Sequence, residues 1–528
     1  MTAGHDRAHV RDRPHPRHVI PAEAANFGVG SWIERRARIA PDDLALVAGR
    51  RQLTYAQLAS RIRRLAHGLR SLGVEPGDRV AWRGEIDPAF LESLFAVGLL
   101  GAALAPVNHR LGPDERAFVL EDTEPRLTIE HHATPPTPIP RSVGHRLAVG
   151  GPREGALDYE AVIAGSPDDV VEAAVHLDDL LLLPHTSGTT GLPKGVMLTH
   201  GNATWNAINF LTCADFRSDD VTIAIAPFFR VGGTGVNVLP VLFVGGTVIV
   251  PEDPQPDGIL ALIERHRVTV GFGNPDLLDA LVRSARWSTV DLSSVRFILT
   301  GGAPVPERLL RTYLDRGVTL LQGYGLSEAA PLALLLDPAS ALRKIGSAGR
   351  PPLLVDVRIV DAHGRDVRLG ETGELTVRGP NVMAGYWRRP VETRDVLTAD
   401  GWLRTGDAAR ADAEGFVWIV DRVDARFISA GVEVYPGDVE RVLASHPSIA
   451  DAGVVGIHET GGDVGMAFVV LAPGASASEE EILAFARGRL AAPAVPASIR
   501  FLNELPRTTV GKLRRQALRT GMEDEEAG

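Results

Sequence analysis

The segment Thr186–Gly195, TSGTTGLPKG, directly follows the apolar run Leu180–Leu183. Three glycines let the backbone turn its N–H groups toward one point, four hydroxyl side chains add donors, and Lys194 adds a cation. The segment is not the G-x-x-x-x-G-K-[ST] loop, because its glycine spacing differs and no Ser or Thr follows Lys194. A buried strand that ends in such a loop predicts an α/β protein with a polyphosphate cradle.

Lysine is scarce in this chain. Of the 55 basic side chains only Lys194, Lys344 and Lys512 are lysine. A compact ammonium on a flexible stem can reach into a crowded phosphate or carboxylate site as a point charge, which a planar guanidinium cannot do. Lys194 and Lys512 both lie in Gly- and Thr-rich segments, so we single them out as candidate site cations.

Length and charge exclude several classes of protein. The chain has 528 residues, enough for two to four cooperative units of ~100–200 residues, and its net charge of −11 argues against nucleic-acid or membrane-surface partners. A single cysteine, Cys213, excludes a disulfide framework. The apolar run 94–107 is shorter than the ~20 residues that span a bilayer. We expect a cytoplasmic protein with a disordered tail over 1–25.

Apolar periodicity alternates between strand-like and helix-like segments. Helices are expected at 31–39, 54–72, 88–100, 436–445 and 478–490, and strands at 79–82, 104–107, 247–250, 296–299, 374–378, 416–420, 450–457 and 466–471. Between 223 and 250 the pattern indicates a strand, a Gly-rich turn, an apolar helix and a strand. After Gly370 the short β segments predict a barrel-like or antiparallel region, and a smaller unit begins near Arg422.

Further motifs follow the phosphate segment in a fixed order. They are Gly301-Gly-Ala-Pro304, Gly323-Tyr-Gly-Leu-Ser-Glu328, Gly346-Ser-Ala-Gly-Arg350, Gly370-Glu-Thr-Gly-Glu374, Thr405-Gly-Asp407, Asp421-Arg-Val-Asp424 and Pro506-Arg-Thr-Thr-Val-Gly-Lys512. With them, the chain resembles the adenylate-forming superfamily, of the acyl-CoA synthetase or AMP-dependent acid ligase type, from about Ser31 to Arg519.

The resemblance implies an α/β fold with a large N-terminal domain, made of two α/β sheets and a small β-barrel, and a mobile, smaller α+β C-terminal domain. The implied boundaries are 26–421 and 422–520, with a hinge near Asp424 and an acidic tail at 521–528. The family's small domain turns about this hinge after adenylation, so that one domain serves two half-reactions.

The resemblance also implies ATP and Mg²⁺ as cofactors, together with CoA, and assigns site residues by position. Phosphates would lie at Thr186, Ser187, Gly188, Thr189, Thr190, Gly191 and Lys194; adenine at Gly302, Ala303, Pro304, Tyr324 and Gly325; the ribose at Asp407 and Arg422; and Mg²⁺ at Glu328. Lys512 would bridge the substrate carboxylate and the α-phosphate. A carboxylate accepts two ribose hydroxyls, and a hard oxygen ligand suits Mg²⁺.

Departures from the family pattern concern the substrate. Arg230, after Phe229 and before Gly232, stands where the family commonly has a histidine or another aromatic residue, so it either extends to solvent or pairs with a second anion. Asn274 stands at a pocket-wall position that is usually apolar and hints at a polar or aromatic acid. Ala430 replaces a frequent glycine where the pantetheine arm enters, which puts CoA as acceptor in question.

The implied activity is ATP-dependent adenylation of a small acid, an aromatic or polar one, followed by transfer to CoA. An alternative acceptor is a separate carrier protein or an amine, and another alternative is activation of a small oxyanion such as nitrite. A third reading is a non-catalytic nucleotide-binding protein, against which the joint presence of Lys194, Glu328, Asp407 and Lys512 argues. The sequence does not fix the acid or the oligomeric state.

Overall fold

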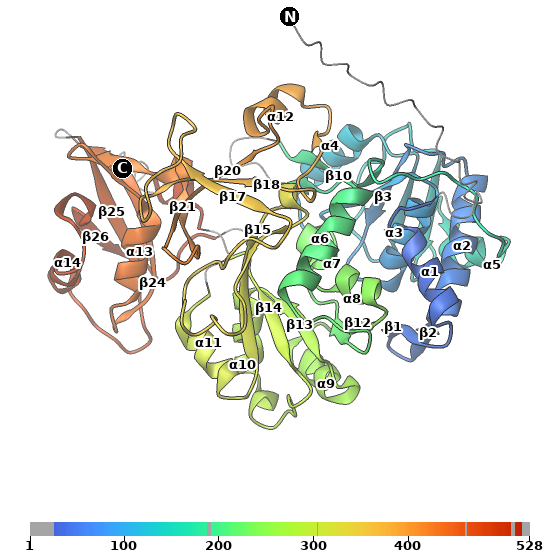
Figure 1. Ribbon diagram of the computed structural model, residues 1–528, viewed down its shortest axis with the longest axis horizontal. Helices are drawn as coiled ribbons and strands as arrows, with labels where there is room; N and C mark the ends of the chain where they lie inside the picture. Colours follow the sequence, from blue (N-terminus) through green and yellow to red (C-terminus); the bar gives the residue numbers. More distant parts are fainter. Residues whose placement is uncertain (1–25, 187–191, 304, 460–461, 508–512, 520–528) are drawn as a thin grey trace, which may run out of the picture.

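A computed structural model describes residues 26–186, 192–303, 305–459, 462–507 and 513–519. Figure 1 shows three groups of elements in chain order: a blue-to-green group, a green-to-yellow group beside it, and an orange-to-red group at the opposite side. Among the described residues no helix is long and apolar enough to cross a membrane.

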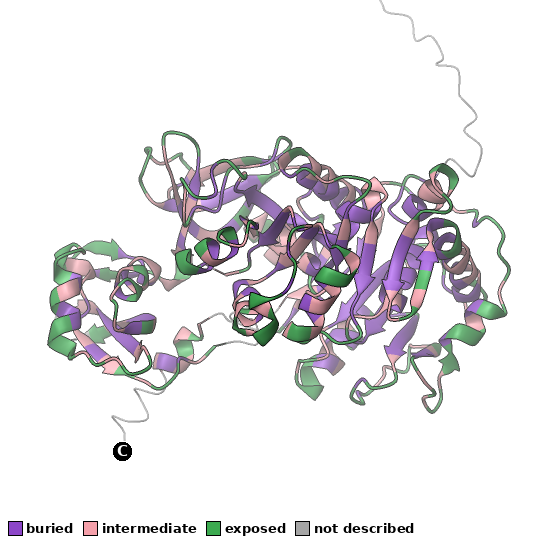
Figure 2. Ribbon diagram, turned by 90° about the horizontal axis from the view of Figure 1, so that it is seen from below, coloured by how far each residue is buried: buried purple, intermediate pink, exposed green. Residues whose placement is uncertain are grey.

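The largest sheet has nine described strands in the order β19-β10-β8-β4-β3-β5-β6-β7, with β9 paired to β10. The strands are β3 (Arg79–Arg83), β4 (Ala103–Val107), β5 (Leu127–His131), β6 (His145–Val149), β7 (Leu157–Asp158), β8 (Leu180–Leu182), β9 (His185–Thr186), β10 (Lys194–Thr199) and β19 (Gly385–Tyr386). Strands β4, β3, β5 and β6 are parallel. Figure 2 shows that strands in the interior are buried, while exposed residues lie on the outer helices and loops.

The first helices of the chain pack on this sheet and on one another through their apolar faces. They are α1 (Ser31–Ile39), α2 (Tyr55–Ser71), α3 (Pro88–Leu99), α4 (Pro113–Thr123) and α5 (Tyr159–Ala164). The helix expected from Thr54 begins at Tyr55, since Thr54 accepts from Gln57 N–H at 3.3 Å and donates its own N–H to Gln57 Oε1 at 2.9 Å. Leu58, Ile62, Leu65 and Leu69 are buried, which confirms the predicted apolar face.

Two further sheets continue the α/β pattern. One has the order β11-β12-β1-β2 and the other β13-β14-β15-β16. Their strands are β1 (Leu44–Ala48), β2 (Arg51–Thr54), β11 (Val221–Ile223), β12 (Thr247–Val250), β13 (Val270–Gly273), β14 (Phe297–Thr300), β15 (Thr319–Gly325) and β16 (Leu332–Leu335). The helices are α6 (His200–Cys213), α7 (Val231–Gly235), α8 (Val238–Val244), α9 (Pro256–His266), α10 (Pro275–Arg283), η2 (Ala285–Ser288), α11 (Glu307–Leu314) and η3 (Ser327–Ala329).

The region after Gly370 is antiparallel, as predicted. Its strands β18 (Gly373–Arg378), β20 (Leu403–Ala411) and β21 (Val417–Arg422) join β17 (Asp356–Val360), which precedes Gly370, in a sheet of the order β17-β18-β20-β21. Helix α12 (Pro390–Val396) lies above them in Figure 1. The motif glutamate Glu374 accepts from Gly406 N–H at 3.1 Å, so two of the sequence motifs meet in this sheet.

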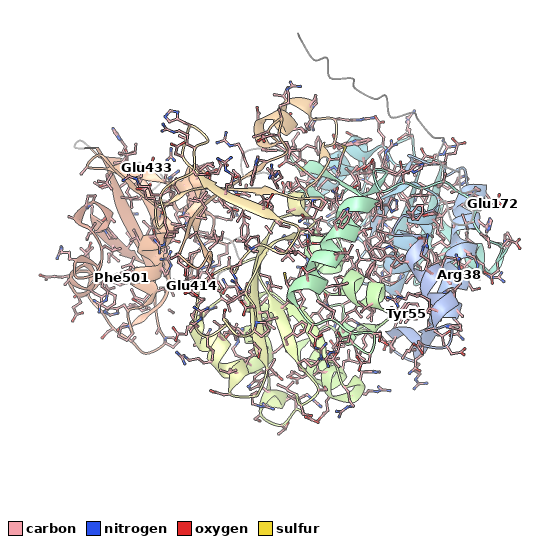
Figure 3. All side chains as sticks on the ribbon, in the orientation of Figure 1. Arg38, Tyr55, Glu172, Glu414, Glu433 and Phe501 are labelled. Atoms are coloured by element: carbon pink, nitrogen blue, oxygen red, sulfur yellow. The ribbon has the colours of Figure 1, made fainter. Side chains whose placement is uncertain are left out.

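The last part of the chain begins with η4 (Val423–Ala425) and the hairpin β22 (Phe427–Ser429) and β23 (Val432–Val434). A three-stranded sheet, β24 (Ile449–Glu459), β25 (Gly462–Leu471) and β26 (Ser498–Phe501), packs with α13 (Pro436–Ala444), α14 (Glu479–Arg487) and η5 (Ala492–Ala494). Figure 3 shows Glu433 and Phe501 in this part, at the opposite side of the molecule from Arg38 and Tyr55. It has its own buried core of apolar side chains around Val454 and Val469.

Two predicted elements differ in detail. The Gly-rich turn after Ile223 contains the short helix α7, because Gly233 must lie close to the chain: a Cβ there would be 2.2 Å from Pro227 O. The glycines therefore serve close packing rather than a turn. Helix α14 ends at Arg487, three residues early, with Gly488 as its C-cap.

Candidate active site

The predicted phosphate segment is framed by a short antiparallel pair. Thr186 in β9 lies opposite Lys194 in β10, and Thr186 Oγ1 donates to Lys194 O at 3.5 Å. The hydroxyl and the lysine that bound the segment are therefore neighbours. Ser187, Gly188, Thr189, Thr190 and Gly191 lie outside the described residues.

Lys194 and Glu328 meet across one tyrosine. The Tyr386 hydroxyl donates to Glu328 Oε1 at 2.8 Å, and Lys194 Nζ lies 5.3 Å from the centre of the Tyr386 ring. Burial and the Glu328 charge raise the pKa of the Tyr386 hydroxyl, so it stays a hydrogen-bond donor. Strand β19, which carries Tyr386, pairs with β10, and this pairing brings the two motifs together.

Tyr324 and Asp407 form the second pair of the site. The Tyr324 hydroxyl donates to Asp407 Oδ2 at 2.5 Å, and Arg422 Nη1 donates to Asp407 Oδ1 at 3.0 Å. Burial, together with the Asp407 charge, raises the pKa of Tyr324. Burial opposes the charge of Arg422, but the nearby Asp407 carboxylate raises its pKa overall. Each carboxylate oxygen keeps a second lone pair that can accept another hydroxyl.

Glycines hold the backbone close to Tyr324. Gly302 has a φ of +85°, and a Cβ on Gly301 would lie 2.6 Å from Gly323 O, so the turn after β14 rests against β15. A Cβ on Gly325 would lie 1.9 Å from Pro331 O. Ala303 is half-buried at the same turn, and Pro304 lies outside the described residues.

Arg230 lies at the start of α7 beside Phe229. Its guanidinium carbon is 5.8 Å from the Phe229 ring centre, and that of Arg110 lies at the same distance from the same ring. Partial desolvation by its neighbours, together with the charge of Arg110, lowers the pKa of Arg230, although the side chains of both arginines are exposed. Neither arginine has an ion-pair partner among the residues that the structure describes. This cationic pair around Phe229 suits an anion.

The other two predicted substrate positions, Gly232 and Asn274, have different surroundings. A Cβ on Gly232 would lie 3.7 Å from the Phe272 ring, an ordinary contact distance, so Gly232 faces β13 without crowding it. Asn274 is the N-cap of α10, and its Oδ1 accepts from Leu277 N–H at 3.1 Å. A helix-capping role thus accounts for a polar residue at this position.

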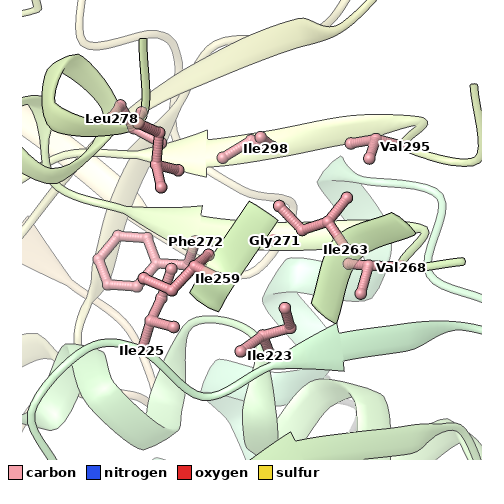
Figure 4. A pocket seen from close by; sticks show the side chains of 11 residues that line it. Ile223, Ile225, Ile259, Ile263, Val268, Gly271, Phe272, Leu278, Val295 and Ile298 are labelled. Carbon is pink, nitrogen blue, oxygen red and sulfur yellow. The ribbon is translucent and has the colours of Figure 1, made fainter. Parts of the chain in front are cut away.

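An apolar cavity lies beside these residues but does not include Arg230 or Asn274 (Figure 4). It is lined by Ile223, Ile225, Ile259, Ile263, Val268, Gly271, Phe272, Leu278, Leu281, Val295 and Ile298. It lies within a hydrophobic core that side chains of β11, β13, β14 and α9 form. With only apolar walls it offers nothing to a carboxylate.

The C-terminal part reaches the site region through Asp421. Arg515 Nη2 lies 3.2 Å from Asp421 Oδ2 and 2.8 Å from each Glu440 carboxylate oxygen. Asp424, the predicted hinge, is exposed in η4 and lies 3.6 Å from Arg422 Nε. Lys512 lies outside the described residues. Lys344, the third lysine, pairs with Asp412 at 2.5 Å and Glu414 at 2.6 Å, which gives it a structural role.

The sequence did not single out Tyr386, Arg110 or the pair His185–Asp122. His185 Nε2 lies 3.2 Å from Asp122 Oδ2, next to the phosphate segment. Each acts through a partner far away in the chain, and none belongs to a motif with a chemical signature of its own. Only the pairing of Gly385 and Tyr386 with β10 marks Tyr386 as a site residue, and this pairing is not visible in the sequence.

Two family models match this chain. The family model "AMP-binding enzyme" matches residues 33–387, and "AMP-binding enzyme C-terminal domain" matches residues 438–512. The chain belongs to the AMP-binding enzyme family. The second match ends at Lys512, so that lysine lies within the family's C-terminal domain.

Curated relatives of this AMP-binding enzyme are acid–CoA ligases. It is 45% identical to a feruloyl-CoA synthase from Amycolatopsis sp, over 92% of this chain and 98% of that one. It is 38% identical to an indoleacetate–CoA ligase from Aromatoleum aromaticum, over 93% and 97%.

Solved structures agree. An anthranilate CoA ligase in complex with anthranoyl-AMP matches with a TM-score of 0.86 and 27% identity, over 96% of this chain and 99% of that one. An o-succinylbenzoate CoA synthetase from Bacillus subtilis, solved with ATP and a magnesium ion, matches with a TM-score of 0.81 and 30% identity. The match covers 93% of this chain and 99% of that one.

The residues of this AMP-binding enzyme fit ATP and Mg²⁺. Glu328 Oε2 has no hydrogen-bond partner among the described residues, which leaves one hard oxygen at the tyrosine whose ring Lys194 also contacts. No group of three or more His, Cys, Asp or Glu side chains gathers anywhere in the described chain. A single carboxylate suits Mg²⁺, which keeps several waters and takes its other oxygens from substrate phosphates.

Proposed function

We propose that this chain is an ATP-dependent aromatic acid–CoA ligase. In the first half-reaction an oxygen of the substrate carboxylate attacks the α-phosphorus of ATP, and the bond to pyrophosphate breaks, giving an acyl-AMP. In the second, the CoA sulfur attacks the acyl carbon, the bond to AMP breaks, and the thiol proton leaves. The observation that carries the proposal is the 45% identity with a feruloyl-CoA synthase along nearly the full length of both chains.

In this proposal the protein supplies charge and alignment rather than a nucleophile. Thr186 and Lys194 bind the phosphates, Glu328 holds Mg²⁺, and Tyr386 orients that carboxylate through its hydrogen bond of 2.8 Å. Mg²⁺, when bound, neutralises charge on the phosphate oxygens. Support comes from the way β10 and β19 bring these three side chains together.

The nucleotide's sugar and base lie, in this proposal, between β15 and β20. Tyr324 stacks on adenine beside Gly302, Ala303, Pro304 and Gly325. Asp407 accepts the ribose hydroxyls through its remaining lone pairs, while Arg422 donates to its Oδ1 from the other side. The hydrogen bonds to Tyr324 and Arg422 fix the carboxylate in place before ATP arrives, which lowers the ordering cost of binding.

The C-terminal domain, over 422–520 with its hinge at Asp424, serves both half-reactions in turn. Lys512 is delivered to the α-phosphate for adenylation and withdrawn for thioester formation. The exposed position of Asp424, with only a 3.6 Å ion pair to Arg422, supports a hinge there, because little packing opposes rotation.

A second candidate acceptor or substrate is an additional anion at Arg230. Two exposed arginines around Phe229, neither with an ion-pair partner among the described residues, favour it, since an anion between them would form charge-assisted contacts. In this reading Arg230, Phe229 and Gly232 meet either a second carboxylate of the acid or a small oxyanion such as nitrite, and Asn274 forms part of the wall. A carrier protein or amine as acceptor has no observation in its favour among the described residues.

A pyrophosphate-release screen tests the proposal. The purified full chain is supplied with ATP, Mg²⁺ and aromatic, cinnamic, amino or dicarboxylic acids, each with and without CoA, and with nitrite separately. We expect release with an aromatic acid and a CoA thioester in the products by mass spectrometry. Release with nitrite but with no organic acid, or acyl-AMP that never reaches CoA, would contradict the ligase proposal.

A further inference from the structure

One face of helix α6 carries three asparagines. Asn202, Asn206 and Asn209 are spaced four and three residues apart, so they lie above one another on the same side of the helix. All three are buried, and Asn209 has no exposed surface. Asparagine is uncommon in a helix interior because its side chain competes for backbone hydrogen bonds, so three on one buried face require partners.

The first two asparagines have those partners. Asn202 Nδ2 donates to Pro380 O at 2.9 Å and to Val382 O at 2.7 Å. Asn206 Nδ2 donates to Gly235 O at 2.8 Å, and Asn206 Oδ1 accepts from Leu332 N–H at 3.1 Å. Their amides thus tie α6 to its neighbours.

Asn209 differs from both. Neither its Oδ1 nor its Nδ2 has a hydrogen-bond partner among the residues that the structure describes, although the side chain is completely buried. Folded proteins satisfy the great majority of buried polar side-chain atoms, and an amide left without any hydrogen bond destabilises the fold. An apolar residue would fill this position at no such cost, so the amide indicates a partner other than the described side chains and backbone around it.

The position of Asn209 relates it to the active site. Asn206, one turn earlier, contacts the last residue of α7, a helix that begins directly after Arg230, and the first residue of β16. Strand β16 follows η3, which carries Glu328. Helix α6 packs on α7, α8 and β16. By its spacing Asn209 lies on the same face of α6 as Asn206, the face that contacts α7 and β16.

We propose that Asn209 is a specificity-determining residue that binds a hydroxyl group on the ring of the aromatic acid. A phenolic hydroxyl both donates and accepts, so it can donate to Oδ1 and accept from Nδ2 of one carboxamide. An unsubstituted ring leaves both atoms unpaired. A site built to bind a hydroxyl discriminates strongly against an analogue that lacks it, because its own polar groups are then left without partners. This inference rests on the proposed aromatic acid ligase function.

The test compares Asn209→Leu with the wild type on cinnamic acid and its three monohydroxy derivatives. In the wild type we expect kcat/KM for the best hydroxylated acid to exceed that for cinnamic acid by about 10–100-fold. In Asn209→Leu this ratio should fall to about 1, with the KM for ATP unchanged. A wild-type ratio near 1, or a ratio that Asn209→Leu leaves unaltered, would overturn the proposal.

Asn206→Leu is the matched control. It is the same substitution one turn away on the same face, and it removes bonds to Gly235 and Leu332. It should lower the melting temperature and keep the hydroxyl preference. Asn209→Leu should keep or raise the melting temperature of the unliganded protein, because it removes an unpaired buried amide. A fall equal to that of Asn206→Leu would give the Asn209 amide a structural partner and overturn the proposal.

Direct binding separates this inference from the proposed function. Calorimetric titration of the full chain with the same acids needs no turnover. If no acid supports pyrophosphate release, the ligase proposal fails, but a hydroxyl preference in binding that disappears in Asn209→Leu would still support the role of Asn209. Equal binding of the hydroxylated and unsubstituted acids to both proteins would contradict it.

Discussion

The Tyr386 hydroxyl donates to Glu328 Oε1 at 2.8 Å, while the Tyr386 ring lies under Lys194 Nζ at 5.3 Å. One side chain from the edge strand β19 thus contacts both the proposed metal ligand and the proposed phosphate cation. The hydroxyl binds Glu328 and the ring contacts Lys194, so substitutions can separate the two roles.

Tyr386→Phe keeps the ring and removes the hydrogen bond. Glu328 then loses its orientation but not its charge, so we expect the Mg²⁺ concentration for half-maximal activity to rise about 3–10-fold, the size of one ordinary net hydrogen bond. The KM for the acid should stay the same. Magnesium titrations of steady-state activity measure this. Tyr386→Leu, which also removes the ring from Lys194, should in addition raise the KM for ATP; equal magnesium requirements in wild type and Tyr386→Phe would contradict the role of the hydroxyl.

The fold and the site differ in how far sequence could predict them. Tyr324, Glu328, Asp407 and Lys194 lie in motifs whose order is characteristic. The structure joins Tyr324 to Asp407 and places Lys194 and Glu328 at one shared tyrosine, Tyr386. Helix ends agree to within a residue or two where a cap such as Thr54 marks them.

Tyr386, Arg110 and Asn209 escaped sequence analysis for one physical reason. Each gains its role from a partner brought close by strand pairing or helix packing, and local periodicity contains no information on such contacts. The Gly-rich segment before α8 was wrongly expected as a turn, because its glycines permit close packing on Pro227 and not a reversal of the chain.

Lys512→Ala tests the division of labour between the half-reactions. Removal of a cation that neutralises charge in the transition state should reduce acid-dependent ATP–pyrophosphate exchange by about 100-fold or more. Conversion of a preformed acyl-AMP with CoA should be retained. Lys344→Ala is the control, since Lys344 pairs with Asp412 and Glu414 away from the site. Comparable losses in both half-reactions would contradict a role limited to adenylation.

Arg230→Leu tests the cationic pair around Phe229. Arg230 is 5.8 Å from the Phe229 ring and has no carboxylate partner among the described residues. If a reactant supplies the anion, its KM should rise about 10–100-fold, the range for one lost charge-assisted contact, while the KM for ATP changes little. Steady-state kinetics for the acid, CoA and ATP identify which reactant is affected. An unchanged KM for all three would contradict the proposal that a reactant binds Arg230.

Ala430→Gly tests the hairpin between β22 and β23. Ala430 has a φ of +48° and Gly431 a φ of +78°, so both residues of this two-residue turn are left-handed. Glycine relieves the backbone strain at this position, which stabilises the folded state. Its greater freedom in the unfolded chain offsets part of this gain, so the free energy of unfolding should rise by about 0.5–1 kcal/mol. Urea denaturation measures it.

The same variant addresses the acceptor. Ala430 is exposed, so its methyl group has room, and the KM for CoA should change by less than about twofold in Ala430→Gly. A tenfold fall would mean that the methyl group crowds the path of the thiol.

His200, the first residue of α6, makes stability depend on pH. Its Nδ1 accepts from Val29 N–H at 2.9 Å, and burial lowers its pKa from 6.5 to about 4. The folded protein thus favours neutral His200, whereas the unfolded chain takes up a proton below pH 6.5. The stabilisation is therefore complete above the unfolded pKa and is lost as pH falls toward 4, by about 3 kcal/mol in total.

His200→Asn separates this titration from the hydrogen bond. The Asn Oδ1 occupies the place of Nδ1 and can still accept from Val29 N–H, but it does not take up a proton in this range. We expect its unfolding free energy, from urea denaturation at pH 8 and pH 4, to fall by about 3 kcal/mol less than that of the wild type. Parallel pH profiles for wild type and His200→Asn would contradict the assignment, since the buried imidazole would then not be the group whose protonation opposes folding.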